Sequence, residues 1–355
     1  MYLSRQANIT RRTFAGLGLG AIGALALGGC SGSGVSETSG SDSGTQASDA
    51  ATATPDSPQT ATIFVFDTVV QMSALCSEEL MDSLVERCTY FENHFSRTVE
   101  GSDVWNVNHA KGKPVEVATE TAEVISAALV YSEASGGLFD ITIGAVSSLW
   151  DFDEGVKPED DAIQAALPHV DWRGVEVEGN AVTLTDPEAM IDLGGIAKGY
   201  IADDLVRMLR DGGCSQASLS LGGNVYVLGQ SYDGDPWNVG VQDPNGADND
   251  VIATVEATDA SVVTSGLYER DFEQDGVLYY HILDPKTGYP VETDLASASI
   301  KSERSLDGDA YSTILFLMGR DAALDLLNTD DRFSGVLVDK DDVAVASDES
   351  GFVLA

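Results

Sequence analysis

The stretch that decides the fold is MIDLGGIAKGYIADD, residues 190–204. Its apolar start, which carries the carboxylate of Asp192, predicts a strand. Gly194-Gly195 then predict a turn, Lys198 follows it, and a helix is expected to begin at Gly199. Glycines let a backbone approach an anion closely, the N–H groups of a helix start point at it, and a lysine adds positive charge. The order therefore suits a phosphate, although a plain structural turn explains the same residues.

The charge of the chain excludes some classes of partner. Its 355 residues have a globular composition, with 58 Asp and Glu against 19 Lys and Arg and a formal net charge of −39. A field of that sign repels nucleic acid and anionic lipid, so no nucleic acid is expected as a direct partner. It would also repel an anionic nucleotide, unless a lysine or a metal ion reverses the field locally.

The first 60 residues predict an export signal and a tether. Arg11-Arg12 precede the apolar run 14–27, which is too short and too rich in glycine for a good membrane-spanning helix. The run ends at Gly28-Gly29-Cys30, which resembles a bacterial lipobox whose cysteine, Cys30, becomes lipidated. We expect residues 1–29 to be an export signal with this lipobox, and residues 30–60, rich in Ser, Gly and Thr, to be a disordered tether. The protein would then be extracytoplasmic, lipid-anchored to the bacterial cell membrane.

Residues 61–355 are expected to form one folded domain. Apolar residues recur at helical spacing over Glu78–Phe95, and Thr119–Ser135 predicts a second helix. Strand patterns dominate after Ala217, and helices are expected again at about 308–318 and 320–327. Because strands and helices are mixed without regular strand–helix–strand units, the sequence predicts an α+β fold with mixed β-sheets flanked by helices.

Three cysteines follow Cys30, namely Cys76, Cys88 and Cys214. They form no CxxC motif and no cluster with histidine, so a zinc site is not expected. A disulfide between Cys76 and Cys88 is possible outside the cytoplasm. The position of Cys88 on an apolar helical stripe equally suits a buried free thiol.

Three further patterns could carry chemistry. Asp309, Ser312 and Thr313 lie at i, i+3 and i+4 of an expected helix, so one face offers a carboxylate and two hydroxyls, oxygen ligands that suit Mg²⁺. A capping aspartate with two buried hydroxyls is the alternative. His281 lies at the end of a strand pattern, beside a tight turn, where it could act as a general base or be structural. Asp140 lies in an apolar, strand-like run, where a carboxylate needs a partner or a ligand.

In chain order, the motifs DLGGIAKGY, LGGN, SGLYER, HILDPKTGYP and DAYST resemble the ApbE family, the FAD:protein FMN transferases. The similarity extends from FDTVV, which begins at Phe66, to about Gly319. It implies a single T-fold-like catalytic domain in an exported protein that is often lipid-anchored. It also implies an activity: Mg²⁺-dependent transfer of FMN from FAD to a Thr or Ser hydroxyl of an exported acceptor protein, with release of AMP.

Carried over by position, the resemblance implies a role for individual residues. His281 would be the catalytic base on the acceptor hydroxyl. The metal ligands would be Asp309, Thr313, the carbonyl of Gly195 and Ser312. The contacts with FAD would come from Phe66, Leu138, Phe139, Asp140, Asp192, Lys198 and Leu283. The chain departs from the family pattern at Phe66, at Thr98, where tyrosine is usual, and at Leu267, where aspartate is common.

Two other functions fit the same motifs. An FAD pyrophosphatase would use water in place of the acceptor hydroxyl and would release free FMN and AMP. A non-enzymatic FAD-binding lipoprotein would store or deliver FAD. Binding alone requires neither a base nor metal ligands, so Asp309, Thr313 and His281 favour an enzyme.

Overall fold

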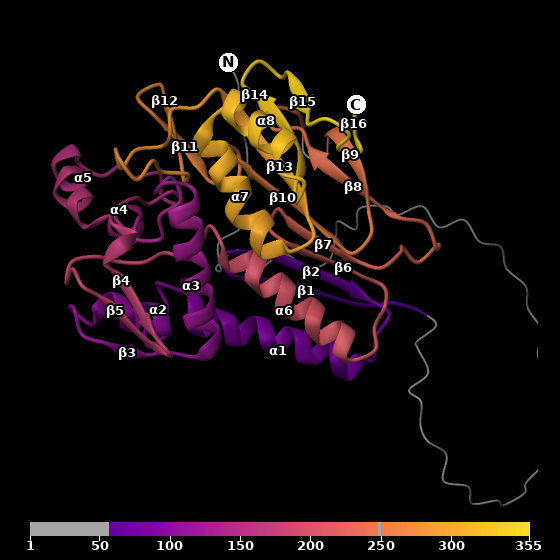
Figure 1. The fold of residues 1–355 in the computed structure, drawn as a ribbon, viewed down its shortest axis with the longest axis horizontal. Coiled ribbons are helices and arrows are strands. Elements are labelled where there is room, and N and C mark those ends of the chain that lie inside the picture. Colours follow the sequence, from indigo (N-terminus) through magenta and orange to yellow (C-terminus); the bar gives the residue numbers. More distant parts are fainter. Residues whose placement is uncertain (1–56, 248–249) are drawn as a thin grey trace, which may run out of the picture. The chain divides into compact units, whose positions relative to one another are not determined.

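An eight-stranded sheet forms the centre of the computed structural model, which describes residues 57–247 and 250–355 (Figure 1). Neighbouring strands pair antiparallel and most of the links between them are hairpins or helices. The strand order is β1 (Gln59–Val65), β2 (Thr68–Ala74), β6 (Ala217–Leu221), β7 (Asn224–Leu228), β10 (Ala260–Gly266), β13 (Leu295–Ser302), β14 (Ser334–Asp339) and β15 (Ala344–Ala346).

Two hydrophobic cores lie on the two faces of this sheet. Val263 and Leu337 belong to the larger core, whereas their chain neighbours Val262 and Val336 belong to the smaller one. This division follows from the alternation of side chains along a strand. The smaller core also receives side chains from a three-stranded sheet of β8 (Trp237–Gln242), β9 (Val251–Ala257) and β16 (Phe352–Leu354). The main sheet is therefore covered by helices on one face and by this small sheet on the other.

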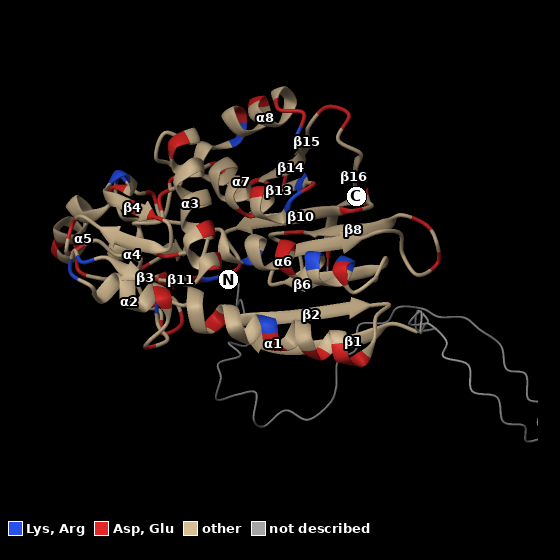
Figure 2. Cartoon of the chain, turned by 60° about the horizontal axis from the view of Figure 1, so that its bottom comes forward, with Lys and Arg blue, Asp and Glu red and all other residues tan. Residues whose placement is uncertain are grey.

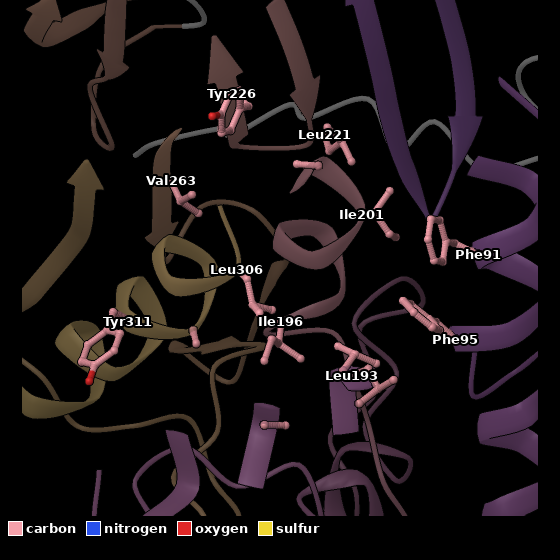
Figure 3. Close-up of a cluster of buried hydrophobic side chains, with 14 of the residues drawn as sticks. Phe91, Phe95, Leu193, Ile196, Ile201, Leu221, Tyr226, Val263, Leu306 and Tyr311 are labelled. Atoms are coloured by element: carbon pink, nitrogen blue, oxygen red, sulfur yellow. The ribbon is translucent and has the colours of Figure 1, made fainter. Parts of the chain in front are cut away.

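Four helices cover the larger core: α1 (Glu78–Phe95), α6 (Ala197–Asp211), α7 (Ser305–Met318) and α8 (Arg320–Thr329). Figure 1 shows α6 between α1 and α7. In Figure 3, Ile201 of α6 lies near Phe91 of α1, and Leu306 of α7 lies beside Ile196. The predicted span and apolar stripe of α1 are confirmed, and the hydroxyl of Ser77 caps its first turn by accepting from the N–H of Leu80.

The chain between β2 and β6 forms a lobe of short elements. Its helices are α2 (Asp103–His109), α3 (Thr119–Ala134), α4 (Gly144–Ser147) and α5 (Asp160–Ala166), and its sheet contains β3 (Val115–Glu116), β5 (Ala181–Leu184) and β4 (Val175–Glu178). A hairpin of β11 (Asp271–Gln274) and β12 (Val277–Tyr280) follows β10 later in the chain. The hydroxyl of Ser102 caps α2 by accepting from the N–H of Trp105.

The predicted α+β class is confirmed, but the sheets are not mixed. Every strand pairing among the described residues is antiparallel, and the isolated bridge between Ile143 and Met190 is the parallel contact there. Hairpins account for this, because a two-residue turn can join only antiparallel strands. Asp and Glu are spread over helices and loops, with fewer Lys and Arg, as the net charge requires (Figure 2).

The last residues of the predicted tether belong to the fold. Gln59 and Thr60 already pair with Ala74 and Ser73 in the β1–β2 hairpin. The export signal, Cys30 and all of the tether before residue 57 lie outside the described residues, so they stay predictions. Within residues 57–247 and 250–355, no helix combines the length and the apolar character needed to cross a membrane.

The three cysteines of the described region are buried free thiols, so Cys76 and Cys88 form no disulfide. Burial raises the pKa of the Cys88 thiol to about 12. A thiol is nucleophilic only as its thiolate, so Cys88 is inert near neutral pH. Cys88 therefore serves to pack the apolar stripe of α1 against the core.

The stretch 190–204 contains the predicted turn and helix, but not the predicted strand. Met190 makes only the isolated bridge to Ile143, and the three residues after it form no strand. Helix α6 begins at Ala197 rather than at Gly199, which places Lys198 in its first turn. The run around Asp140 likewise forms turns instead of the expected strand. Both runs are apolar because they are buried, and burial alone does not distinguish a strand from an extended turn.

Helices α6 and α7 pack in close contact at Gly199. A Cβ at this position would lie 2.4 Å from the carbonyl oxygen of Ser305 and 2.7 Å from the Cβ of Asp309. One turn further along α6, Asp203 accepts from the N–H groups of Ser305 and Leu306 at 2.8 and 3.0 Å. Asp203 thus caps α7 from a different helix, which fixes the end of α7 against the stretch 190–204.

Gly199→Ala is expected to lower the free energy of unfolding by about 1–3 kcal/mol or more, because the backbone atoms it would meet cannot rotate away. Urea denaturation measures this change. Gly194→Ala is the control, since its Cβ would meet only the Oδ1 of Asp192, at 3.2 Å. Equal stability of the two variants would show that the helices separate without cost.

Candidate active site

The structure brings together predicted metal ligands that are more than a hundred residues apart in sequence. Gly195 lies just before α6 and Thr313 lies on α7, and a Cβ on Gly195 would be 3.8 Å from the Oγ1 of Thr313. Asp309 is only 4% exposed, and its Oδ2 accepts from the N–H of Gly199 at 2.8 Å. Its other oxygen, Oδ1, has no hydrogen-bond partner within the described residues.

The hydroxyls of Ser312 and Thr313 meet at Ser265, a residue of β10. The Oγ of Ser265 lies 2.9 Å from the Oγ of Ser312 and 3.3 Å from the Oγ1 of Thr313. Ser312 also donates to the carbonyl oxygen of Asp309 at 2.9 Å. Asp309 is not a helix cap, because α7 begins four residues earlier, at Ser305. This position excludes the alternative interpretation of Asp309 as an N-cap.

The donors at this point fit Mg²⁺. Within residues 57–247 and 250–355, no group of three or more His, Cys, Asp or Glu could hold a metal ion. The free carboxylate oxygen of Asp309, the hydroxyl of Thr313 and the carbonyl of Gly195 are instead hard oxygen donors. Mg²⁺ keeps several waters and needs few protein ligands, so a set with one carboxylate suits it better than a transition metal.

Asp192 and Lys198 lie on the two sides of the glycine turn. The carboxylate of Asp192 accepts from the N–H of Gly194 at 2.9 Å and from the Oγ of Ser147 at 2.8 Å. It also pairs with Arg97, whose Nε is 3.1 Å from Oδ2. The Nζ of Lys198 donates to the carbonyl oxygen of Gly194 at 3.3 Å. The ammonium group is therefore held beside the turn by one long hydrogen bond, which leaves donors for a ligand.

Phe139 and Asp140 support the turn from the lobe. The ring of Phe139 approaches within 3.0 Å of the point that a Cβ on Gly195 would occupy. Asp140 accepts from the N–H and the Oγ1 of Thr142 at 2.8 and 2.6 Å, and from the N–H of Trp172 at 3.1 Å. Burial outweighs these hydrogen bonds and raises the pKa of Asp140. The hydrogen-bond partners that a buried carboxylate needs are thus supplied to Asp140 by Thr142 and Trp172.

Leu138 and Leu283 differ in their surroundings. Leu283 is buried in a small core with Val146 and Trp150, and Leu138 is half-buried. The side chain of Leu283 therefore has a packing role in this structure. The predicted contacts of both residues with FAD stay predictions.

Phe66 lies at the tip of the β1–β2 hairpin. Phe66 and Asp67 have φ angles of 58° and 55°, so they form a two-residue hairpin turn. Arg270 donates to the carbonyl oxygen of Asp67 at 3.3 Å. A Cβ on Gly222 would lie 2.2 Å from the Oγ1 of Thr68, so a larger residue there would displace the side chain of Thr68. The hairpin tip therefore contacts both LGGN and SGLYER.

His281 follows β12, and its N–H donates to the carbonyl oxygen of Arg270 at 3.1 Å. Its Nδ1 is buried and has no hydrogen-bond partner within the described residues. Burial, together with the positive charges of Lys198 and Arg270, lowers the pKa of His281 to about 4. The imidazole is therefore neutral at neutral pH, the state in which it can accept a proton.

Several site residues were missed by the sequence reasoning. Arg97 and Ser147 hold Asp192, and Ser265 joins the two hydroxyls of α7. The Oε1 of Glu269 lies 2.7 Å from the Cβ position of Gly223. Burial raises the pKa of Glu269 to about 7, the nearby Asp309 adds to this shift, and Lys198 and Arg270 oppose it. Glu269 belongs to the motif SGLYER, which the sequence analysis had singled out without assigning this residue a role.

Several known proteins are similar to this chain in sequence. A family model described as the ApbE family matches residues 66–337. The chain is 40% identical over 245 residues to the FAD:protein FMN transferase of Treponema pallidum, covering 64% of this chain and 67% of that protein. It is 36% identical over 252 residues to an FAD:protein FMN transferase of Klebsiella pneumoniae, covering 69% of this chain and 78% of that protein.

Two solved structures share the fold. The crystal structure of the ApbE protein from Thermotoga maritima matches with a TM-score of 0.75 and 32% identity, over 82% of this chain and 97% of that one. The flavin transferase ApbE from Vibrio cholerae matches with a TM-score of 0.73 and 24% identity, over 83% of this chain and 98% of that one.

Proposed function

This chain belongs to the ApbE family, and from that premise we propose that it transfers FMN from FAD to a threonine or serine hydroxyl of an acceptor protein and releases AMP. The observation that carries the proposal is the meeting of the stretch 190–204 with the face of α7 at Gly195 and Thr313. The proposed oxygen ligands and Lys198 lie close together there. A reaction at a pyrophosphate requires such groups, because they stabilise its negative charge.

Three groups would hold Mg²⁺: the free carboxylate oxygen of Asp309, the hydroxyl of Thr313 and the carbonyl of Gly195. When bound, Mg²⁺ would neutralise negative charge on the pyrophosphate. Lys198 would bind phosphate oxygens with the donors that its single hydrogen bond to Gly194 leaves available. In a chain with a net charge of −39, such local positive charge is also what admits an anionic dinucleotide.

His281 would take the proton of the acceptor hydroxyl while that oxygen attacks the phosphorus of the FMN half of FAD. The bond from this phosphorus to the bridging oxygen breaks, and AMP leaves with that oxygen and the electron pair. The proton then passes from His281 to solvent or to AMP. The lowered pKa of His281 leaves its imidazole neutral before the reaction, the state in which it can accept a proton.

The remaining assignments concern the binding of FAD and the location of the protein. We propose that Phe66, Leu138 and Phe139 contact FAD through apolar surface, and that Asp192 contacts it in the orientation set by Arg97. We also propose contacts with FAD for Asp140, which lies within the lobe, and for Leu283, which is buried against Val146 and Trp150 of the lobe. We also propose that Cys30 is lipidated, so that the acceptor would be an exported protein.

The test is to incubate the purified protein with FAD, Mg²⁺ and a candidate acceptor, then to read covalent flavin by fluorescence in a denaturing gel. A fluorescent acceptor band with release of AMP is expected. Free FMN and AMP without a labelled protein would establish an FAD pyrophosphatase instead. FAD that is bound but not cleaved would establish a flavin-binding lipoprotein.

A further inference from the structure

We propose that Ser265 is a positioning residue of the metal site, which orients the hydroxyl of Thr313 toward the metal through an ordered chain of hydrogen bonds. The inference rests on the proposed function, because it concerns the Mg²⁺ ligands. It adds a residue from β10 to a site otherwise built from α7 and the stretch 190–204.

The direction of each hydrogen bond follows from the one group that can only accept. The carbonyl oxygen of Asp309 has no proton, so Ser312, 2.9 Å away, must donate to it. A serine hydroxyl has a single proton. Across the 2.9 Å contact with Ser265, Ser312 must therefore accept, and Ser265 must donate.

The same step fixes the hydroxyl of Thr313. The proton of Ser265 is already directed at Ser312, so in the 3.3 Å contact with Thr313 the donor is Thr313. Its proton then points toward β10, and its lone pairs are free on the side where Gly195 lies. A hydroxyl binds a cation through a lone pair, and a proton aimed at the cation would oppose binding.

Ser312 takes a different role in this arrangement from the one that the resemblance implied. Its side chain is fully buried, and its hydroxyl donates to Asp309 and accepts from Ser265. We therefore propose that Ser312 sets the direction of these hydrogen bonds. Asp309, Thr313 and Gly195 remain the direct ligands.

The structure offers a matched control on the same pair of strands. Thr264 of β10 and Ser299 of β13 form another hydroxyl pair, with their oxygens 2.7 Å apart. Within the described residues this pair has no hydrogen bond to α7. Ser299→Ala therefore removes one buried hydroxyl of the same kind. It leaves the hydrogen bonds among Ser312, Ser265 and Thr313 in place.

The experiment measures Mg²⁺ binding by the full chain without FAD, by calorimetry, and repeats it with Mn²⁺ by electron paramagnetic resonance. Ser265→Ala is expected to weaken the affinity about 10-fold to 100-fold, the usual effect of losing a group that orients a metal ligand. Ser299→Ala should bind as the wild type does. Ser265→Thr and Ser265→Val differ only in the hydroxyl, and we expect Thr to retain the affinity and Val to lose it, even if Ala impairs folding.

A double-mutant cycle tests whether Ser265 acts through Thr313. In a Thr313→Val background, Ser265→Ala is expected to have no further effect on affinity. Wild-type affinity of both Ser265→Ala and Ser265→Val, or an additive loss in the double variant, would overturn the inference while FMN transfer by the wild type still upholds the proposed function. A wild-type chain that transfers FMN but binds neither Mg²⁺ nor Mn²⁺ would overturn the metal site and the inference together.

Discussion

Asp309→Asn is expected to reduce FMN transfer by at least about 100-fold and to abolish measurable Mg²⁺ binding, because it removes the only carboxylate from the proposed ligands. The substitution nearly preserves shape. The amide oxygen can still accept from the N–H of Gly199, which is buried and needs that partner. The amide NH₂ then occupies the place of Oδ1, the oxygen with no partner among the described residues, and presents protons where a cation would bind.

Comparison with Asp309→Ala separates function from folding. Alanine leaves the N–H of Gly199 without its hydrogen bond, so this variant should also lose about 1–3 kcal/mol of unfolding free energy. Asp307→Asn is the control on the same helix, because Asp307 accepts from the hydroxyl of Tyr131 and has no part in the proposed ligand set. Transfer by Asp309→Asn at the wild-type rate, measured by fluorescence of the acceptor in a gel, would refute the metal site.

Local pattern predicted those parts of the fold in which burial and periodicity agree. The stripe of Leu84, Cys88 and Phe91 repeats with the period of a helix, and α1 has the predicted bounds. The run that begins at Met190 is equally apolar but has no period, and it proved to be an extended turn held by a bridge to Ile143. The apolar character of a segment indicates that it is buried. Its backbone conformation depends on neighbours that the sequence does not show.

The candidate site illustrates the same limit. The spacing of Asp309 and Thr313 predicted a shared helical face, but nothing near them in sequence indicated that Gly195 lies opposite. That pairing came from the order of motifs along the chain, and the structure explains it by the contact at Gly199. Ser265 lies in the motif SGLYER, but the sequence did not indicate its contact with Ser312, nor the contact of Arg97 with Asp192.

His281→Ala is expected to reduce FMN transfer by about 100-fold to 10,000-fold while FAD binding persists, because the loss concerns proton removal and not contacts with the dinucleotide. The fold should tolerate the change. Nδ1 of His281 has no hydrogen-bond partner among the described residues, and the backbone N–H that donates to Arg270 remains. His169→Ala is the matched control, since His169 pairs with Asp186 at the surface and lies outside the proposed site. Normal transfer by His281→Ala would show that another group takes the proton.

The pH dependence of transfer then distinguishes a base from a merely structural histidine. A pKa lowered to about 4 keeps the imidazole neutral throughout the range from pH 8 to pH 5. The titration of His281 should therefore lower the transfer rate in the wild type as the pH approaches 4, and not near 6.5, where an exposed histidine gains its proton. In His281→Ala the residual rate should lose this dependence, because the group that titrates is gone. An acid limb that persists unchanged in the variant would assign the titration to a different group, and His281 would no longer be the base.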